Sequence, residues 1–284
     1  MIKYNLLVAL RNMSRNKIFS TINILGLAGS MAVFVLITSY VRLIAGTDKF
    51  HEHHPNIFRI ERPKIHNMAA PIGPFLKQNY PEVEEYIRTY EIQGNGGLVK
   101  HNDKFIRLNS TWLADSSFFN VFTFPLIAGN PSSVLSSPDG IVLSEESAKR
   151  IFGDINPIGQ SILWGNKHNL RVTGIMENMP ANSSIQADAV IPIDFYKTMR
   201  NDSKALDNFY QWNYNTFLLL KTGVNVAEFE KKLQDELFEF LKKNIQIPES
   251  EKIEFILTNF PDIYFNTYNN NDDLTHGSRS NITI

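Results

Sequence analysis

The stretch IFSTINILGLAGSMAVFVLITSYV, residues 18–41, contains no charged side chain. A helix rises ~1.5 Å per residue, so a helix of this length crosses the ~30 Å hydrocarbon core of a bilayer. A signal peptide has a shorter apolar region of ~7–15 residues and a small-x-small cleavage site, whereas this stretch runs into Tyr40-Val41-Arg42-Leu43. A buried core helix is the remaining alternative. We predict a retained transmembrane helix over residues 18–45.

The charges beside this helix predict its orientation. The first acidic residue of the chain is Asp48, whereas four basic residues precede the helix: Lys3, Arg11, Arg15 and Lys17. Basic flanks stay cytoplasmic, so we expect residues 1–17 inside and everything after Ala45 outside. Within residues 1–17 the apolar side chains repeat at helical spacing. This spacing predicts either a cytoplasmic amphipathic segment lying on membrane lipid or only the basic flank of the span.

Composition limits the chemistry of the part outside the membrane. The chain has no cysteine, which excludes disulfides, thiolate chemistry and cysteine metal sites. With 43% hydrophobic residues and 20 phenylalanines it can fill a sizeable core. Four of the 28 basic residues and none of the 29 acidic ones precede the helix, so the remainder is net negative. A net negative domain argues against a nucleic-acid partner.

Two β-α-β units are predicted far apart in the sequence. The first has strands at 56–62 and 84–92 around a helix at 71–79, and the second has strands at 214–221 and 252–260 around a helix at 226–243. Asn225 is placed to cap the second helix, with Glu228 completing a capping box.

The middle of the chain has a different pattern. A short strand at 141–143 leads into a helix capped by Ser144, whose first turn carries Glu145 and Glu146. Strands follow at 161–164, 170–176 and 186–191. We therefore predict an α+β domain at 46–284 with two lobes. Paired β-α-β units form lobe 1 (46–137 and 209–284), and an inserted β-rich part forms lobe 2 (138–208), with a loop at 266–281.

Several stretches resemble one protein family, the permease subunits of MacB-type ABC transporters (MacB/FtsX-like permeases). These stretches are LLVALRNMSRNKIFSTINILGLA (6–28), TDKFHEHHPNIFRIER (47–62), LNSTWLADSSFFNVFTFPLIAGNP (108–131), IVLSEESAKRIFGDINPIGQSI (141–162) and RVTGIMENMPANSSIQADAVIP (171–192). The resemblance spans almost the whole chain, and 141–162 is its most specific part. Thr47 stands where family members usually have phenylalanine. The resemblance implies one transmembrane helix followed by a MacB-like periplasmic core domain.

Family members carry three more transmembrane helices after this domain, and the chain stops at Ile284, about where the second would begin. The resemblance therefore implies a truncated chain or a split subunit. It also implies a bacterial inner-membrane location and a separate cytoplasmic ATPase subunit that binds the ATP. Further implied partners are a second permease copy or paired permease, and a periplasmic adaptor or envelope protein. The domain would transmit ATP-driven movements, for export of a substrate or action on an envelope partner.

No catalytic or cofactor site stands out in the sequence. It has no Gly-x-x-x-x-Gly-Lys-[Ser/Thr] phosphate loop and no Gly-x-Ser-x-Gly elbow. A Ser-x-x-Lys match at Ser14–Lys17 lies at the membrane edge, and the adjacent residues of the cluster His51–His54 cannot all converge on one metal ion. We expect neither an enzyme nor a metal or cofactor site. A single-span sensor or binding ectodomain is the alternative function, although its 17-residue tail is too short for an output module.

Two groups of residues are candidate packing sites. Small residues at small-xxx-small spacing allow close helix approach in the membrane; they are Gly26, Ala28, Ser30 and Ala32. The resemblance assigns Asp48, Phe50 and His51 to packing at the membrane junction. The aromatic run Phe118, Phe119, Phe122 and Phe124 has spacing that favours core burial over a ligand surface.

Overall fold

The computed structural model describes Tyr4 and residues 11–63, 65–92, 97–247, 253–266 and 274–277. The chain forms two compact units, Met1–Gly46 and Thr47–Ile284. The first holds the helix α2, Lys17–Ala45, which is long and apolar enough to cross a membrane. The predicted helix over 18–45 is thus confirmed. Apart from Tyr4 and residues 11–17, the predicted amphipathic segment lies outside the described residues.

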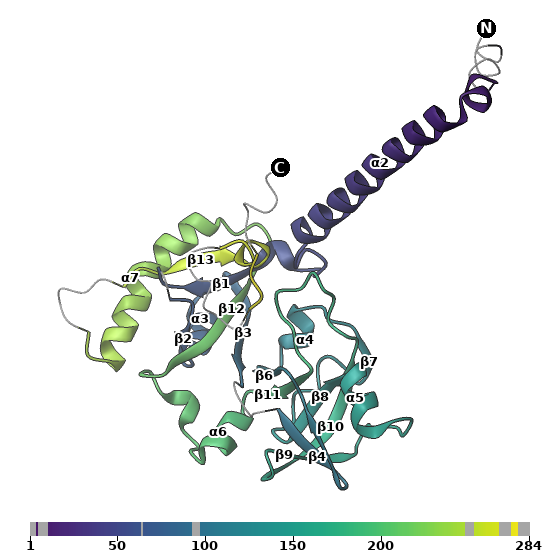
Figure 1. Cartoon of the computed structure of the whole chain (residues 1–284). Helices are drawn as coiled ribbons and strands as arrows, with labels where there is room; N and C mark the ends of the chain where they lie inside the picture. The colour runs from purple at the N-terminus through teal and green to yellow at the C-terminus, as the bar shows by residue number, and fades with distance from the viewer. Residues whose placement is uncertain are drawn as a thin grey trace. The chain divides into compact units, whose positions relative to one another are not determined.

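The second unit contains mixed helices and strands, which Figure 1 labels where there is room. Its helices are η1 (His54–Asn56), α3 (Ile72–Asn79), α4 (Phe118–Val121), α5 (Glu145–Phe152), α6 (Phe195–Arg200), η2 (Ala205–Asp207), α7 (Val226–Asn244) and α8 (Phe260–Ile263). Its strands are β1 (Ile57–Glu61), β2 (Met68–Ala69), β3 (Val83–Glu91), β4 (Leu98–His101), β5 (Lys104–Arg107), β6 (Thr111–Ala114), β7 (Leu126–Ala128), β8 (Gly140–Ser144), β9 (Ser161–Trp164), β10 (His168–Met176), β11 (Ala189–Pro192), β12 (Trp212–Leu220) and β13 (Ile256–Asn259).

The described strands join one continuous sheet with the order β13-β1-β12-β3-β6-β11-β8-β10-β9-β4-β5, to which β2 and β7 attach at β12 and β10. In its first part the two β-α-β units interleave, because β12 lies between β1 and β3 and pairs antiparallel with both. This is the split β-α-β arrangement. The predicted pairing of the 56–92 and 214–260 segments is therefore confirmed.

Both faces of this first part are covered. The side chains of Ile60, Leu218 and Leu257 pack against α3 and α7. On the opposite face, Ile57 and Phe217 pack in a second cluster with α4 and α8. Alternate residues of β1 and β12 thus enter two different cores, as expected of a strand whose successive side chains point to opposite faces. The helix α7 begins at its predicted cap, where the Asn225 side chain accepts a hydrogen bond from the amide of Glu228.

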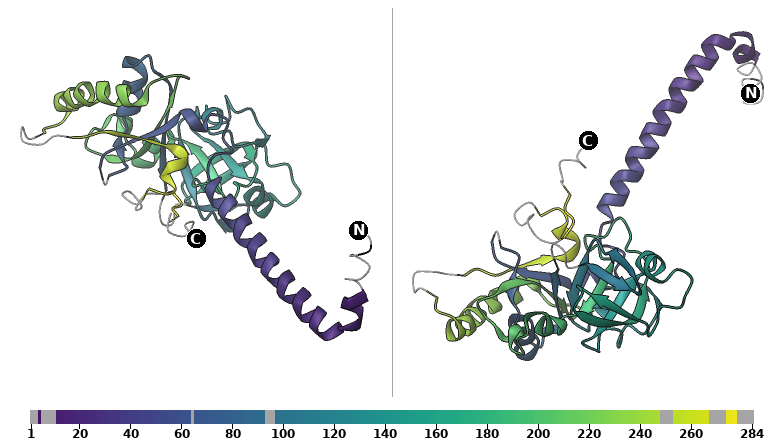
Figure 2. Two further views of the ribbon diagram at one scale, coloured as in Figure 1. Left: turned by 90° about the horizontal axis from the view of Figure 1, so that it is seen from above. Right: turned by 60° about the horizontal axis from the view of Figure 1, so that its bottom comes forward.

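The second part of the sheet, from β6 to β5, lies beside the first in all views of Figures 1 and 2. A third core fills it, in which Ile151 and Phe152 of α5 pack with Leu143, Trp164 and Phe195. The predicted helix N-cap is confirmed, because the Ser144 hydroxyl accepts a hydrogen bond from the amide of Ser147 at 3.2 Å. Parallel pairs occur here, β8 with β10 and β6 with β11.

The division into lobes stays a prediction. Residues 98–114 fall in the predicted lobe 1, yet β4 pairs with β9 and β6 pairs with β11, both of which belong to predicted lobe 2. The two parts of the sheet meet where β3 pairs with β6 over Thr89–Glu91 and Trp112–Ala114. We call this short ladder the seam. Most of the predicted loop at 266–281 lies outside the described residues.

Candidate functional site

The candidate site begins with the residues that follow α2 directly in sequence. Thr47, Asp48 and His51 are 3%, 0% and 1% exposed, although they stand within a polar stretch. Phe50, the third predicted junction residue, is 39% exposed. We call residues 47–51 the junction segment. Three of its five side chains are buried in the second unit, so it is not a loose tether.

Asp48 binds this segment to the loop 180–186 before β11, which we call the Ser184 loop. Its backbone amide donates to the carbonyl of Asn182 at 2.9 Å. Its Oδ1 accepts hydrogen bonds from the Ser184 amide at 2.9 Å and from the Ser183 hydroxyl at 3.3 Å. The backbone of Asp48 has a φ of +59°, a left-handed conformation that aspartate and asparagine tolerate better than most residues. The side chain and the unusual backbone together make a specific attachment.

The electrostatics of Asp48 are those of a buried carboxyl with few partners. Its Oδ2 atom is buried and has no hydrogen-bond partner among the described residues. Burial raises the pKa of Asp48 from 3.8 to about 6, against the lowering effect of the hydrogen bonds from Ser184 and Ser183. The attachment therefore holds a group that titrates near neutral pH.

His51 occupies an aromatic pocket. Its ring centroid lies 4.7 Å from that of Phe124 in an edge-on arrangement, 5.5 Å from Phe260 and 5.6 Å from Phe122. Both ring nitrogens are buried without a hydrogen-bond partner among the described residues. Burial, and then the charge of His54, lowers the pKa of His51 from 6.5 to about 3. His51 is thus a neutral packing residue at ordinary pH.

The C-terminal stretch meets the same loop. The amide of Thr275 donates to the Ser184 carbonyl at 2.8 Å, and the preceding Leu274 is buried in the same core as Phe122 and Phe260. Ser184 therefore binds the junction segment through its amide and the C-terminal stretch through its carbonyl. Residues from both ends of the second unit are held at one backbone position.

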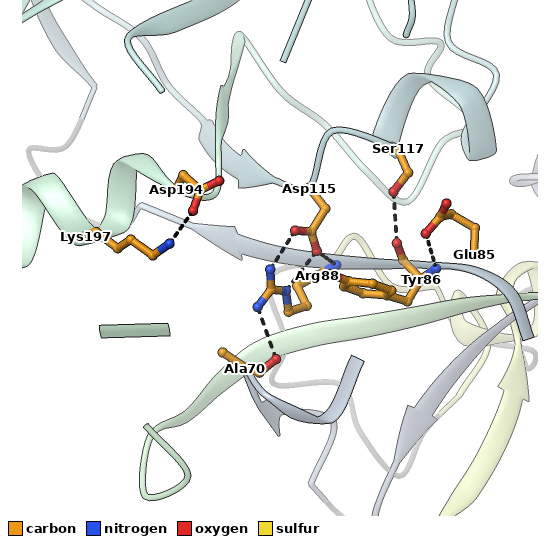
Figure 3. A network of polar contacts seen from close by, with 8 residues as sticks. All are labelled: Ala70, Glu85, Tyr86, Arg88, Asp115, Ser117, Asp194 and Lys197. Carbon is orange, nitrogen blue, oxygen red and sulfur yellow. Dashed lines mark hydrogen bonds and ion pairs between the residues drawn. The ribbon is translucent and has the colours of Figure 1, made fainter. Parts of the chain in front are cut away.

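A second polar cluster lies at the seam, shown in Figure 3. The Arg88 guanidinium of β3 makes a bidentate pair with Asp115, which follows β6: Nε donates to Oδ2 at 2.9 Å and Nη2 to Oδ1 at 2.7 Å. Its Nη1 donates to the Ala70 carbonyl at 3.2 Å. The Asp115 carboxylate also accepts from the Arg88 backbone amide at 2.7 Å. One ion pair thus ties β3, the end of β6 and the turn before α3.

A third polar cluster, formed by two charged residues of β1, is buried. The Arg59 Nη2 and Nε atoms donate to Oε2 of Glu61 at 2.8 and 3.0 Å, and the two side chains are 0% and 2% exposed. The other Glu61 oxygen accepts from the hydroxyl of Thr258 and from Asn266. This pair therefore joins β1, β13 and the stretch that follows α8.

The predicted site residues have different outcomes. Asp48 and His51 lie in one attachment, as described above. The small residues of α2 are all exposed in the isolated chain, so their role in helix packing stays a prediction. Phe118, Phe119, Phe122 and Phe124 are buried, which confirms the core interpretation. The described residues contain no group of three or more histidine and carboxylate side chains arranged to hold a metal ion.

Residues 20–236 match the family model of the MacB-like periplasmic core domain. The chain belongs to this family. MacB-like periplasmic domains are parts of ABC-type permeases. The family match begins within α2 and runs into α7, so it includes the junction segment, the seam and the Ser184 loop.

Solved structures share this MacB-like fold. A domain of a protein described as a permease, from Porphyromonas gingivalis, superposes with a TM-score of 0.61 at 24% identity, covering 74% of this chain and 93% of that one. The periplasmic region of MacB from Actinobacillus actinomycetemcomitans superposes with a TM-score of 0.51 at 18% identity, covering 73% and 90%. A comparison with curated proteins finds none that matches the chain.

Proposed function

We propose that this chain is the permease subunit of an ABC transporter of the MacB/FtsX-like type, and that its MacB-like domain transmits ATP-driven movements to a substrate or an envelope partner. Residues 1–17 lie in the cytoplasm and the second unit in the periplasm of a bacterial inner membrane. ATP binds to a separate ATPase subunit. The family membership and the basic residues before α2 support this assignment.

The attachment of the junction segment is the observation that carries the proposal. A mobile tether would not pass on a displacement of α2, because a flexible chain absorbs it. Here Asp48 is bound at both its backbone and its side chain, and His51 is buried three residues later. A movement of α2 therefore acts on the Ser184 loop, and through it on β11 in the middle of the sheet.

The seam is the place where such a movement would change the domain. Among the described residues three Cα pairs join β3 to β6, with one flanking backbone hydrogen bond on each side, whereas the β12–β3 ladder runs along most of β3. Two packings that differ by a few kcal/mol are sufficient for a switch biased by a partner. The Arg88–Asp115 pair crosses this seam and would define one of the two states.

Affinity purification from native membranes tests the proposal. The chain of residues 1–284 carries a tag after residue 284, and the detergent extract is examined for an ATP-binding-cassette protein and for a second copy of the chain. We expect a cassette ATPase in stoichiometric amount. A chain with the junction changed by Asp48→Ala should retain the ATPase, because the change lies in the second unit. Recovery of the chain without any such ATPase, across several detergents, would favour the sensor alternative and contradict the proposal.

A further inference from the structure

The junction segment contains two buried titratable groups only three residues apart. Neither Oδ2 of Asp48 nor either ring nitrogen of His51 has a hydrogen-bond partner among the described residues. A buried polar atom without a partner makes the folded arrangement sensitive to the charge of its group. We call the junction closed when Asp48 is hydrogen-bonded to the Ser184 loop and His51 is buried. The free energy of this closure therefore depends on the protonation of both Asp48 and His51.

The surroundings of the two groups supply few charges. The loop 180–186 and the stretch 122–124 contain no titratable residue. On the junction segment and just after it, Lys49 and Glu52 are exposed, and His54 is half-buried and destabilises a charged His51. From the C-terminal side the titratable residues are Asp262, Tyr264 and His276, of which Asp262 is exposed. None of these forms an ion pair with Asp48.

The two groups respond to acid in opposite directions. The pKa of Asp48 is raised from 3.8 to about 6, so the closed junction binds its proton more tightly than an open one. Closure is therefore favoured by acid and weakens as the pH rises towards about 6. The pKa of His51 is lowered from 6.5 to about 3, so an open junction binds its proton more tightly. Closure is favoured above pH 6.5 and weakens as the pH falls.

We propose that the junction is a proton-compensated latch, in which Asp48 and His51 offset each other so that the binding of the junction segment to the Ser184 loop changes little with periplasmic pH. This latch does not depend on what the chain transports. Removing either group exposes the pH response of the other. The Asp48→Asn variant keeps an oxygen for the Ser184 amide, and asparagine tolerates the left-handed backbone. The His51→Phe variant fills a pocket already built from phenylalanine rings.

Hydrogen exchange measures the latch directly. The amides of Asp48 and Ser184 are bonded across the junction and exchange when it opens. The full chain in detergent is compared at pH 5 and pH 8, with rates corrected for intrinsic chemical exchange, as natural protein, as Asp48→Asn and as His51→Phe. Asp262→Asn removes an exposed carboxylate of α8 and serves as the matched control.

The expected results differ in sign. In His51→Phe the opening constant rises roughly tenfold from pH 5 to pH 8, as linkage predicts for the Asp48 shift. In Asp48→Asn it falls roughly thirtyfold over the same range, as linkage predicts for His51. The natural chain and the Asp262→Asn control change by only about threefold. Equal pH dependence in all four proteins, or a response of the same sign in both junction variants, would overturn the proposal. If His51→Phe packs poorly, His51→Leu provides the same comparison.

Discussion

The Oδ1 atom of Asp48 accepts a hydrogen bond from the Ser184 amide at 2.9 Å across 136 positions of sequence. This contact attaches the residues that follow α2 to the loop before β11. The Ser184 carbonyl accepts a hydrogen bond from the Thr275 amide, so residues from both ends of the second unit contact the same loop.

The first prediction separates the hydrogen bonds of Asp48 from its charge. Asp48→Ala leaves the Ser184 amide and Ser183 hydroxyl without their acceptor and places alanine at a φ of +59°. We expect a loss of about 2–4 kcal/mol in the free energy of unfolding. Asp48→Asn keeps the acceptor and removes a buried charge, so it should be at least as stable as the natural chain at pH 7. Urea unfolding followed by tryptophan fluorescence checks both, and equal losses would contradict the assignment.

The second prediction concerns the seam. Arg88 and Asp115 have side-chain exposures of 9% and 13%, so Arg88→Met leaves a largely buried carboxylate without its cation. We expect a cost of about 3 kcal/mol. Lys197→Met breaks the ion pair with Asp194, whose side chains are 40% and 55% exposed, and should cost less than about 1 kcal/mol. Comparable losses in thermal unfolding would show that the seam pair contributes no more than a surface pair.

The buried pair behind β1 gives a third prediction. Arg59→Met leaves the Glu61 carboxylate buried with only neutral donors, and we expect a loss of about 3–5 kcal/mol. The double variant Arg59→Met/Glu61→Leu also removes the unpaired buried carboxylate, so it should regain much of the lost free energy of unfolding. A double variant less stable than Arg59→Met, measured by urea unfolding, would mean that the charges themselves hold β1 to β13.

A fourth prediction follows from the pocket of His51. The pKa of its ring is lowered from 6.5 to about 3, so His51 destabilises the folded state as the pH falls below 6.5, because the unfolded chain binds the proton first. This contribution is at most about 1.4 kcal/mol per pH unit, and Asp48, whose pKa is raised, offsets part of it. Without the histidine only the Asp48 effect remains, so His51→Phe should gain stability as the pH falls, whereas His53→Phe should follow the natural chain. Urea midpoints between pH 7 and pH 5 measure the difference; an unchanged slope in His51→Phe would disprove the burial effect.

The sequence predicted many of the strands and the two capped helices. Alternation of apolar and charged residues identified the strand at 56–62, and a continuous apolar run identified the strand at 214–221. The hairpin β4–β5 was missed, although Asn102-Asp103 between two alternating runs is a hairpin signal, and Asn102 has a φ of +53°.

The polar clusters could not be read from the sequence. Arg59 and Glu61 alternate with apolar residues, a pattern typical of a strand with one face in solvent. In the structure β1 is covered on both faces, and both charges are buried. Arg88 and Asp115 are separated by 27 positions, and only the pairing of β3 with β6 brings them together. Strand pairing of this kind is a tertiary property that local patterns do not specify.

The most direct measurement is a distance across the seam during the ATPase cycle. The chain has no cysteine, so spin labels at Lys231→Cys on α7 and Lys167→Cys between β9 and β10 are the only labels it carries. In native membranes that contain the ATPase, pulsed electron paramagnetic resonance compares nucleotide-free and ATP-trapped states. We predict that the distance between the two labels changes with nucleotide when the junction is natural. In the Asp48→Ala variant this change should disappear. A distance that does not respond to nucleotide, or that responds equally in Asp48→Ala, would contradict transmission through the junction.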